Sequence, residues 1–194
     1  MTRSTVLLIL RVWLVAALGI GVSGVLRGVS VPPPAIAVGL TILILLLIRL
    51  SRTAREGAWA LGPGPLVAFH LTRIAAGAYF LILYRRGALP AEFAVPAGWG
   101  DIVVGVGAIV VLAICLPVRT RGQRIGLLVW NTAGLIDILG VLLNGARLFA
   151  GNPAIGVLFT TLPLALLPTF VVPLVIVSHV LLFGHRRPSH RQFP

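Results

Sequence analysis

The stretch LLVWNTAGLIDILGVLLNGAR, from Leu127 to Arg147, decides how the whole chain is interpreted. It is long and apolar enough to cross a bilayer, because about 20 apolar residues in a helix span a hydrocarbon core of about 30 Å. Near its middle, however, lies the carboxylic acid Asp137. An ionised side chain at the centre of a spanning helix costs roughly 3 kcal/mol and usually faces a partner, a water-filled cavity or a substrate path. The stretch therefore predicts a transmembrane helix with one polar face.

The composition is that of a membrane protein. Of the 194 residues, 58% are hydrophobic and only 10% are charged, which is more apolar surface than a soluble domain of this length can bury. The net charge of +12 arises from arginines, since the sequence contains no lysine. These arginines lie at the ends of apolar runs, as topology determinants do, and so predict no nucleic-acid partner. The absence of lysine excludes Schiff-base chemistry, and the single cysteine, Cys115, excludes an intramolecular disulfide.

Six apolar stretches predict an all-α bundle of six transmembrane helices that forms one domain, residues 1–194. Clusters of proline and glycine, such as GPGP at 62–65, separate the stretches. The first stretch is interpreted as a retained span, because Arg11 interrupts the apolar core that a signal peptide would need. Residues 85–98 are expected to form the longest loop. The predicted spans are about 5–22, 34–50, 65–84, 101–117, 126–146 and 156–183.

The connecting segments predict the orientation of the bundle, because positively charged loops stay in the cytoplasm. Both termini are therefore expected in the cytoplasm, with residues 185–194 as a short basic tail. In this orientation the cytoplasmic side holds Arg3, Arg49, Arg52, Arg55, Arg119, Arg121, Arg124, Arg186, Arg187 and Arg191, and the other side holds only Arg27, Arg85, Arg86 and Arg147.

Arg73 is the predicted partner of Asp137. The two residues lie near the middle of their spans and thus at a similar depth. A hydrogen-bonded pair of arginine and carboxylate offsets much of the cost of burying either charge. His70 lies three residues before Arg73 and shares its helix face. On the span of Asp137, Asn144 shares the face of the carboxylate, whereas Asn131 points about a quarter-turn away and can reach another helix.

The last span contributes backbone groups to the predicted site. An interior proline leaves the carbonyl four residues earlier without its usual donor, so Pro173 frees the carbonyl of Thr169. Inside a membrane such a carbonyl must be satisfied by a side chain or by water, and Arg73 has enough donors to reach it. The alternative is that the prolines only bend a packed helix. The predicted intramembrane polar site comprises Arg73, Asp137, His70, Asn131, Asn144 and Thr169.

Catalytic and metal-binding motifs are not recognised in the sequence. HExxH, GxSxG, a Walker loop and a cysteine pair are all absent, so no metal site is predicted and an enzyme is not favoured, although an intramembrane enzyme that acts on lipid stays open. Glu92 and Asp101 flank the predicted long loop and could be paired carboxylates for acid-base chemistry, but beside Arg85 and Arg86 they are interpreted as members of surface ion pairs. His70 and His179, on different spans, are the minimum for a bis-imidazole haem site. Their expected depths differ by about one helical turn, so a hydrogen-bonded structural role is preferred for each, and haem remains an alternative.

Several segments resemble a family of small bacterial multi-pass membrane proteins that are known mainly as uncharacterised. The resemblance rests on PAGWGD at 96–101, WNTAGLID at 130–137 and LPLALLPTFVVPLVIVSH at 162–179, with FHLTRIAAG at 69–77 as a further segment. It implies a location in the bacterial cytoplasmic membrane. It carries over no activity and no site residue.

The function we expect is the binding or transport of a small solute or proton through the polar site, with the lipid bilayer as the surrounding partner. Two alternatives stay open. One is a haem-binding membrane redox protein that uses His70 and His179. The other is a structural or accessory subunit, in which the buried charges only fix the packing of the helices.

Overall fold

The computed structural model describes residues 2–185, and these residues form helices and turns without any strand. Six of the helical segments are long and apolar enough to cross a membrane, which confirms the predicted all-α architecture of six spans. All but the first residue of the predicted basic tail, 185–194, lies outside the described residues. The six spans are Arg3–Ser23, Pro33–Leu50, Pro63–Arg85, Ala91–Cys115, Arg121–Gly151 and Leu167–Gly184.

Several of these spans are built from more than one helical element. The third is broken at His70 and Leu71, the fourth ends in a π-helical turn, and the sixth begins with one. The elements are α1 (Arg3–Ser23), η1 (Val25–Gly28), α2 (Pro33–Leu50), α3 (Arg52–Ala60), α4 (Pro63–Phe69), α5 (Thr72–Arg85), α6 (Ala91–Val110), η2 (Val111–Cys115), α7 (Arg121–Gly151), α8 (Pro153–Leu158), η3 (Leu167–Val171) and α9 (Val172–Gly184).

Local sequence signals set the ends of these helices. α1 ends at Gly24, which has a φ of 71° and so adopts the left-handed conformation that glycine tolerates best. α2 begins with prolines in its first turn, where no amide donor is needed. α7 begins with a capping box, in which the Thr120 hydroxyl accepts from the Gln123 amide at 3.2 Å and the Gln123 side chain accepts from the Thr120 amide at 3.0 Å.

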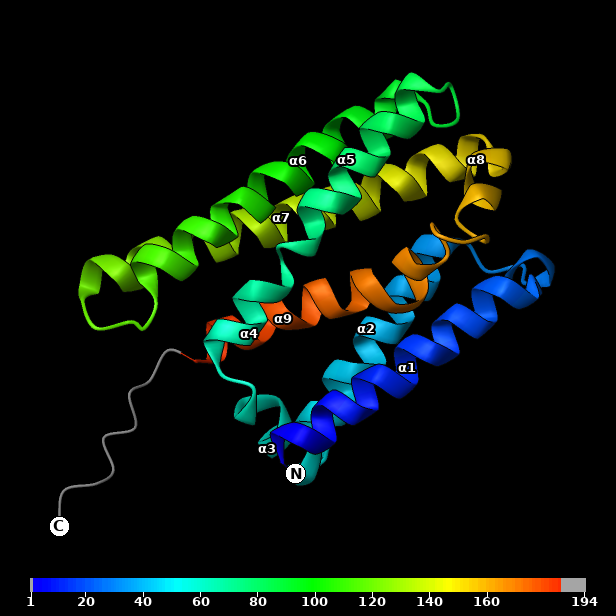
Figure 1. The fold of residues 1–194 in the computed structure, drawn as a ribbon. Helices are drawn as coiled ribbons and strands as arrows, with labels where there is room; N and C mark the ends of the chain where they lie inside the picture. The colour runs from blue at the N-terminus through cyan, green and yellow to red at the C-terminus, as the bar shows by residue number, and fades with distance from the viewer. Residues whose placement is uncertain (1, 186–194) are drawn as a thin grey trace, which may run out of the picture.

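The helices form two groups around α9, which is the most buried of the six spans. Figure 1 shows α5, α6 and α7 side by side on one flank of α9, and α1 and α2 on the other. The short helix α3 lies at the end of the bundle where α9 finishes, since the rings of Trp59 and His185 are 4.5 Å apart. The start of α1 contacts the same end through α3.

Small residues allow α5 and α6 to approach closely. A Cβ atom added at Gly98 would lie 2.8 Å from the Leu81 side chain, and one added at Gly105 would lie 2.6 Å from Ile74. Membrane helices pack closely where glycines remove the side chain between two backbones. This close packing brings the middle of α6 directly against the middle of α5.

The fourth span begins ten residues earlier than predicted, at Ala91 instead of residue 101. Pro96 was expected to interrupt the chain, yet it lies inside α6. The helix tolerates it because the carbonyl that Pro96 leaves without a donor, that of Glu92, accepts a hydrogen bond of 2.7 Å from Asn144 Nδ2 on α7. Asp101 is therefore in the middle of a spanning helix and not at its start.

The last span begins later than predicted, at Leu167 instead of about residue 156. The preceding residues form the short helix α8 and a series of turns. The hydroxyl groups of Thr160 and Thr161 donate to the carbonyls of Val157 and Leu158, at 2.7 and 3.2 Å. Threonine side chains that bond their own backbone in this way compete with helix formation.

Candidate functional site

Arg73 on α5 joins three spans through its guanidinium group. Its Nε donates to Asp101 Oδ1 on α6 at 2.6 Å, and its Nη2 donates to Asp137 Oδ2 on α7. Its Nη1 donates to the Gly134 carbonyl at 3.3 Å. Arg73 itself is only 1% exposed. The pairing of Arg73 with Asp137 that the sequence predicts is present, and Asp101 is a second carboxylate that the sequence reading had placed at a loop. We call Arg73, Asp101 and Asp137 the charge cluster.

The charge cluster contains one cation and two acids. The side chains of Asp101 and Asp137 are 8% and 22% exposed. Among residues 2–185, the arginine is the only basic group within ion-pair distance of either carboxylate. If both acids are ionised, the cluster carries one uncompensated negative charge in the middle of the bundle, where an unpaired charge is strongly disfavoured.

The Asp137 carboxylate occupies space that a glycine on α6 leaves open. The position of a Cβ atom at Gly100 would overlap Asp137 Oδ1. Any larger residue at this position would push the carboxylate away from Arg73. Gly100 therefore shapes the charge cluster without contributing a polar group of its own.

His70 and His179 form a second buried cluster next to the first. Both are fully buried, and their ring centroids are 4.1 Å apart. His179 Nδ1 lies 2.8 Å from Asn131 Oδ1, and Asn131 Nδ2 donates to the His179 carbonyl at 3.1 Å. His70 Nε2 lies 3.0 Å from the Ser178 hydroxyl. We call these two rings the histidine pair, with Asn131 and Ser178 as its hydrogen-bond partners.

The hydrogen bonds fix which ring nitrogens carry hydrogen when the histidines are neutral. The Asn131 oxygen can only accept, so His179 Nδ1 is the donor. The Ser178 hydroxyl donates to the Val175 carbonyl at 2.8 Å and so accepts from His70 Nε2. The remaining nitrogens, His70 Nδ1 and His179 Nε2, have no partner within the described residues. Each is thus a buried hydrogen-bond acceptor without a donor among these residues.

Trp130 covers the histidine pair. Its ring centroid lies 5.2 Å from that of His70 and 5.7 Å from that of His179. Its indole nitrogen donates to the Val104 carbonyl at 2.9 Å, which fixes the ring against α6. The histidine pair is therefore enclosed by an aromatic side chain from α7 and isolated from water on that side.

A family comparison covers most of this chain and both clusters. The family model described as Domain of unknown function (DUF8737) matches residues 28–185. The chain belongs to the DUF8737 family. This confirms the expectation of a family without an assigned activity, and among the six spans of this DUF8737 chain only α1 precedes the matched residues. No curated protein and no solved structure matches the chain.

Gly134 connects the two clusters of the DUF8737 domain. Its carbonyl accepts from Arg73, while a Cβ atom added to it would lie 2.9 Å from His179 Nε2. The Gly134 backbone is thus bonded to the charge cluster. Because Gly134 has no side chain, the His179 ring of the histidine pair can pack directly against it. The two clusters form one continuous polar core between α5, α6, α7 and α9.

Two residues of the predicted polar site lie elsewhere in the DUF8737 domain. Asn144 donates to the Glu92 carbonyl at the start of α6. The Thr169 hydroxyl donates to the Ala165 carbonyl at 2.7 Å, and the Thr169 carbonyl accepts from Trp13 Nε1 at 3.0 Å instead of from Arg73. Both residues hold helices together beside a proline, outside the polar core.

The histidine pair can be compared with the geometry that a haem would need. Axial ligands bind the iron from opposite faces of the macrocycle. In the structure the rings of His70 and His179 contact each other, contrary to the expected difference in depth, and leave no room for a macrocycle between them. The pair in this arrangement does not fit a haem. Within the described residues there is also no group of three or more acidic, histidine or cysteine side chains placed to hold a metal ion.

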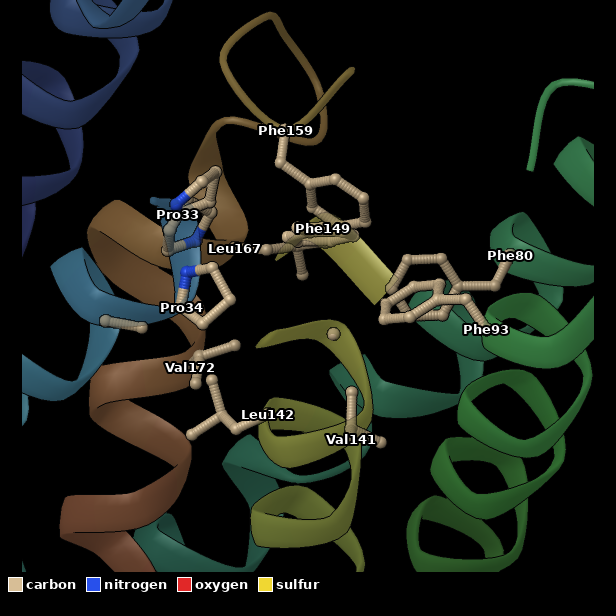
Figure 2. A pocket seen from close by; sticks show the side chains of 13 residues that line it. Pro33, Pro34, Phe80, Phe93, Val141, Leu142, Phe149, Phe159, Leu167 and Val172 are labelled. Carbon is tan, nitrogen blue, oxygen red and sulfur yellow. The ribbon is translucent and has the colours of Figure 1, made fainter. Parts of the chain in front are cut away.

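A separate small cavity lies beside the polar core and is purely apolar. Figure 2 shows the rings of Phe80, Phe93, Phe149 and Phe159 gathered along one part of its wall, with the prolines that begin α2 on another. Its lining contains no charged or hydrogen-bonding side chain. A charged solute would lose its hydration there without compensation, so the candidate site is the polar core and not this cavity.

Proposed function

We propose that this protein is a multi-pass membrane protein that binds a proton at its charge cluster and carries it across the membrane. The observation that supports this function is the ratio of charges, one guanidinium for two carboxylates, of which Asp101 is buried and Asp137 is partly buried. Such an arrangement has two charge states. The cluster is neutral when one carboxyl holds a proton, and it carries one negative charge when that proton leaves.

The low polarity of the surroundings makes the bound proton a stable component of the cluster. Two carboxylates that share a site cannot both ionise easily, because each disfavours the charge of the other. The single arginine compensates only one of them. A carboxylate without a partner at the middle of a span costs roughly 3 kcal/mol, and protonation removes this penalty. The cluster therefore has the chemistry of a proton-binding centre.

The difference in exposure between the two acids suggests a route for the proton. The Asp137 side chain is 22% exposed, whereas that of Asp101 is 8% exposed. Asp137 is thus the group that exchanges its proton with the outside of the bundle, and Asp101 is the inner group. The unprotonated nitrogens of the histidine pair lie beyond Gly134 and are hydrogen-bond acceptors within the same core.

The membrane in which the protein lies, and its orientation there, are part of the same proposal. The distribution of arginines over the loops favours an orientation in which the start of α1, the helix α3 and the end of α9 face the cytoplasm. The resemblance to small bacterial multi-pass proteins favours the bacterial cytoplasmic membrane. A proton gradient exists across that membrane, and a carboxylate in the bundle can take up and release the protons that this gradient drives.

Proton flux into liposomes tests this function directly. The purified chain is reconstituted in vesicles that contain a pH-sensitive dye, and a potassium diffusion potential drives proton entry. We expect flux in the native protein and at least a tenfold loss in the Asp101→Asn and Asp137→Asn variants. Glu92→Gln is the matched control, since Glu92 lies on α6 with Asp101 but has an exposed side chain. Flux that is unchanged by Asp137→Asn would remove that carboxylate from any transport mechanism.

The alternative role as a structural or accessory subunit gives a different result in the same assay. In that case neither the native protein nor its variants conduct protons, while the variants are less stable. Stability and flux measured on the same preparations therefore separate the two functions.

A further inference from the structure

A long apolar groove lies on the opposite side of α9 from the charge cluster. It has a volume of about 710 Å³ and is bounded by α1, α2 and α9, with α3 and α4 at one end. Figure 1 shows how these helices are arranged. Grooves of about 300–1,000 Å³ are typical of sites for small ligands. Its size is therefore that of a binding site and not of a packing defect.

The walls of the groove are made of aliphatic side chains, and none of the described residues that line it is charged. It is open along one side, because Leu7 on α1 is 39% exposed and Leu43 and Leu47 on α2 are each 52% exposed. A peptide in this groove would leave backbone amides and carbonyls without partners. A hydrocarbon chain has no such groups, so the walls suit an acyl chain. The walls comprise mainly Val6, Leu10, Trp13, Ile44, Leu174 and Leu181.

Arginines surround the end of the groove that α3 closes. Ser51, Thr53 and Ala54 line this end, and they alternate along the chain with the exposed residues Arg52 and Arg55. Arg55 Nη1 donates to the carbonyl of Arg49 at 3.4 Å, so the Arg55 side chain lies against the end of α2, next to the lining residues Ile48 and Ser51.

One acid lies among these arginines, and it is already paired. Glu56 accepts from Arg52 Nε at 2.9 Å, and this hydrogen bond lowers the pKa of the Glu56 carboxyl below its usual value. The carboxylate therefore stays ionised and offsets Arg52. Arg49 and Arg55 remain as an excess of positive charge at the mouth, which is complementary to a phosphate group.

We propose that the groove binds one acyl chain of an anionic phospholipid, whose phosphate lies between Arg49 and Arg55. The apolar walls select the chain, and the arginines select the negative headgroup. This site is separate from the proposed proton function and does not depend on it.

The inner wall of the groove touches the polar core at Phe69, whose ring centroid is 6.1 Å from that of His70, and at Ser178. Ser178 lines the groove, and its hydroxyl is bonded to both His70 and the Val175 carbonyl. Because the hydroxyl already has hydrogen-bond partners within the protein, Ser178 presents no unsatisfied polar group to the groove. A chain in the groove therefore lies one side chain away from the histidine pair.

Lipid retention measured by native mass spectrometry tests the site. The full chain in detergent is titrated with phosphatidylglycerol and with phosphatidylcholine. We expect one phosphatidylglycerol to be retained in preference to phosphatidylcholine. Arg49→Gln or Arg55→Gln should each weaken the binding of phosphatidylglycerol about fivefold, because one arginine near an anionic lipid strengthens its binding by about this factor. Arg85→Gln, at the end of α5, is the matched control for charge and should bind as the native protein does.

A second pair of variants tests the walls. Leu47 lines the groove and Leu46 does not, although they are neighbours on α2 with exposures of 52% and 49%. Leu47→Trp should reduce retention of phosphatidylglycerol, and Leu46→Trp should leave it unchanged. Equal retention of the two lipids by the native protein, or equal losses in each variant and its control, would overturn the proposal and indicate annular lipid only.

Tryptophan quenching keeps the proposal falsifiable if a groove variant fails to fold. Trp13 lines the groove, whereas Trp99 lies on α6 and is 56% exposed. Two proteins are prepared in which either Trp13 or Trp99 is kept and the other tryptophans are replaced by phenylalanine. In phosphatidylcholine vesicles, brominated phosphatidylglycerol should quench Trp13 at a lower mole fraction than brominated phosphatidylcholine does, and Trp99 should show no preference. No preference at Trp13 would refute the site.

Discussion

Arg73 and Asp101 are 28 residues apart in the chain, yet Arg73 Nε donates to Asp101 Oδ1 at 2.6 Å in the centre of the bundle. The same guanidinium also donates to Asp137. One side chain therefore fixes the relative positions of α5, α6 and α7. Its loss would affect charge balance and helix packing at the same time.

Removal of the arginine should be severely destabilising. Arg73→Gln leaves two buried carboxylates without a cation, and breaking a buried pair in this way typically costs about 3–5 kcal/mol. We expect a large decrease in thermal stability, measured by size-exclusion chromatography after heating. The triple variant Arg73→Gln, Asp101→Asn, Asp137→Asn should regain much of that stability, because it leaves no unpaired charge. A triple variant as unstable as the single one would contradict the charge argument.

Gly100→Ala should disturb the charge cluster without changing any polar group. The added methyl group would occupy the position of the Asp137 carboxylate, which must then move away from Arg73. We expect lower stability and, if the cluster carries protons, lower proton flux. Gly140→Ala on α7 is the control, since a Cβ atom there meets nothing within 4 Å. Identical behaviour of the two alanine variants would show that the close approach of Gly100 is unimportant.

Asn131→Leu should destabilise the histidine pair. The substitution removes the acceptor of His179 Nδ1 and the donor to the His179 carbonyl, and a buried polar group without a partner costs about 1–3 kcal/mol. The ring of Trp130 contacts both histidines, so near-UV circular dichroism reports any loss of order. Thr132→Ala, at the exposed neighbouring position, should leave the spectrum unchanged. An unchanged spectrum in Asn131→Leu would mean that packing alone orders the pair.

Trp13→Phe should loosen α1. The indole donates to the Thr169 carbonyl at 3.0 Å, and a phenylalanine keeps the ring contact with Phe170 but loses this hydrogen bond. The expected cost is about 0.5–1.5 kcal/mol, with faster hydrogen exchange in α1. Adding Pro173→Ala supplies an amide that can satisfy the Thr169 carbonyl, so the double variant should exchange more slowly than Trp13→Phe. If Pro173→Ala instead adds its own destabilisation to that of Trp13→Phe, so that α1 exchanges faster in the double variant, the link between Trp13 and Pro173 is refuted.

The sequence was sufficient for the architecture and for part of the polar core. The six spans and the contact between Arg73 and Asp137 follow from hydropathy and from the depth of the two charges. Asp101 is missing from the predicted polar core because the sequence predicts a loop over residues 85–98 and a span that starts only at residue 101. The signal that was available is the high mean hydropathy of the 25-residue segment from Ala91 to Cys115, in which Asp101 lies near the middle.

The histidine pair shows where reasoning from linear depth fails. The sequence predicted His70 and His179 to lie about one turn apart in depth, yet their rings are in contact. The break of the third span at His70 and the late start of the last span at Leu167 both shift the depth of these residues. Such breaks depend on tertiary contacts, which a count of apolar residues does not contain.

The two interior prolines Pro96 and Pro173 also carry information about which helices become neighbours. Each leaves one carbonyl without an amide donor, and each of these carbonyls accepts from a side chain of another span, Asn144 on α7 or Trp13 on α1. Apolar surfaces alone give little discrimination between neighbours in a membrane, since lipid solvates every helix equally well. A carbonyl that only one distant donor can reach supplies that discrimination. In this chain a proline and its remote donor thus act as a matched pair that helps to specify which helices lie side by side, and substitution of either member alone would remove the hydrogen bond between those two helices.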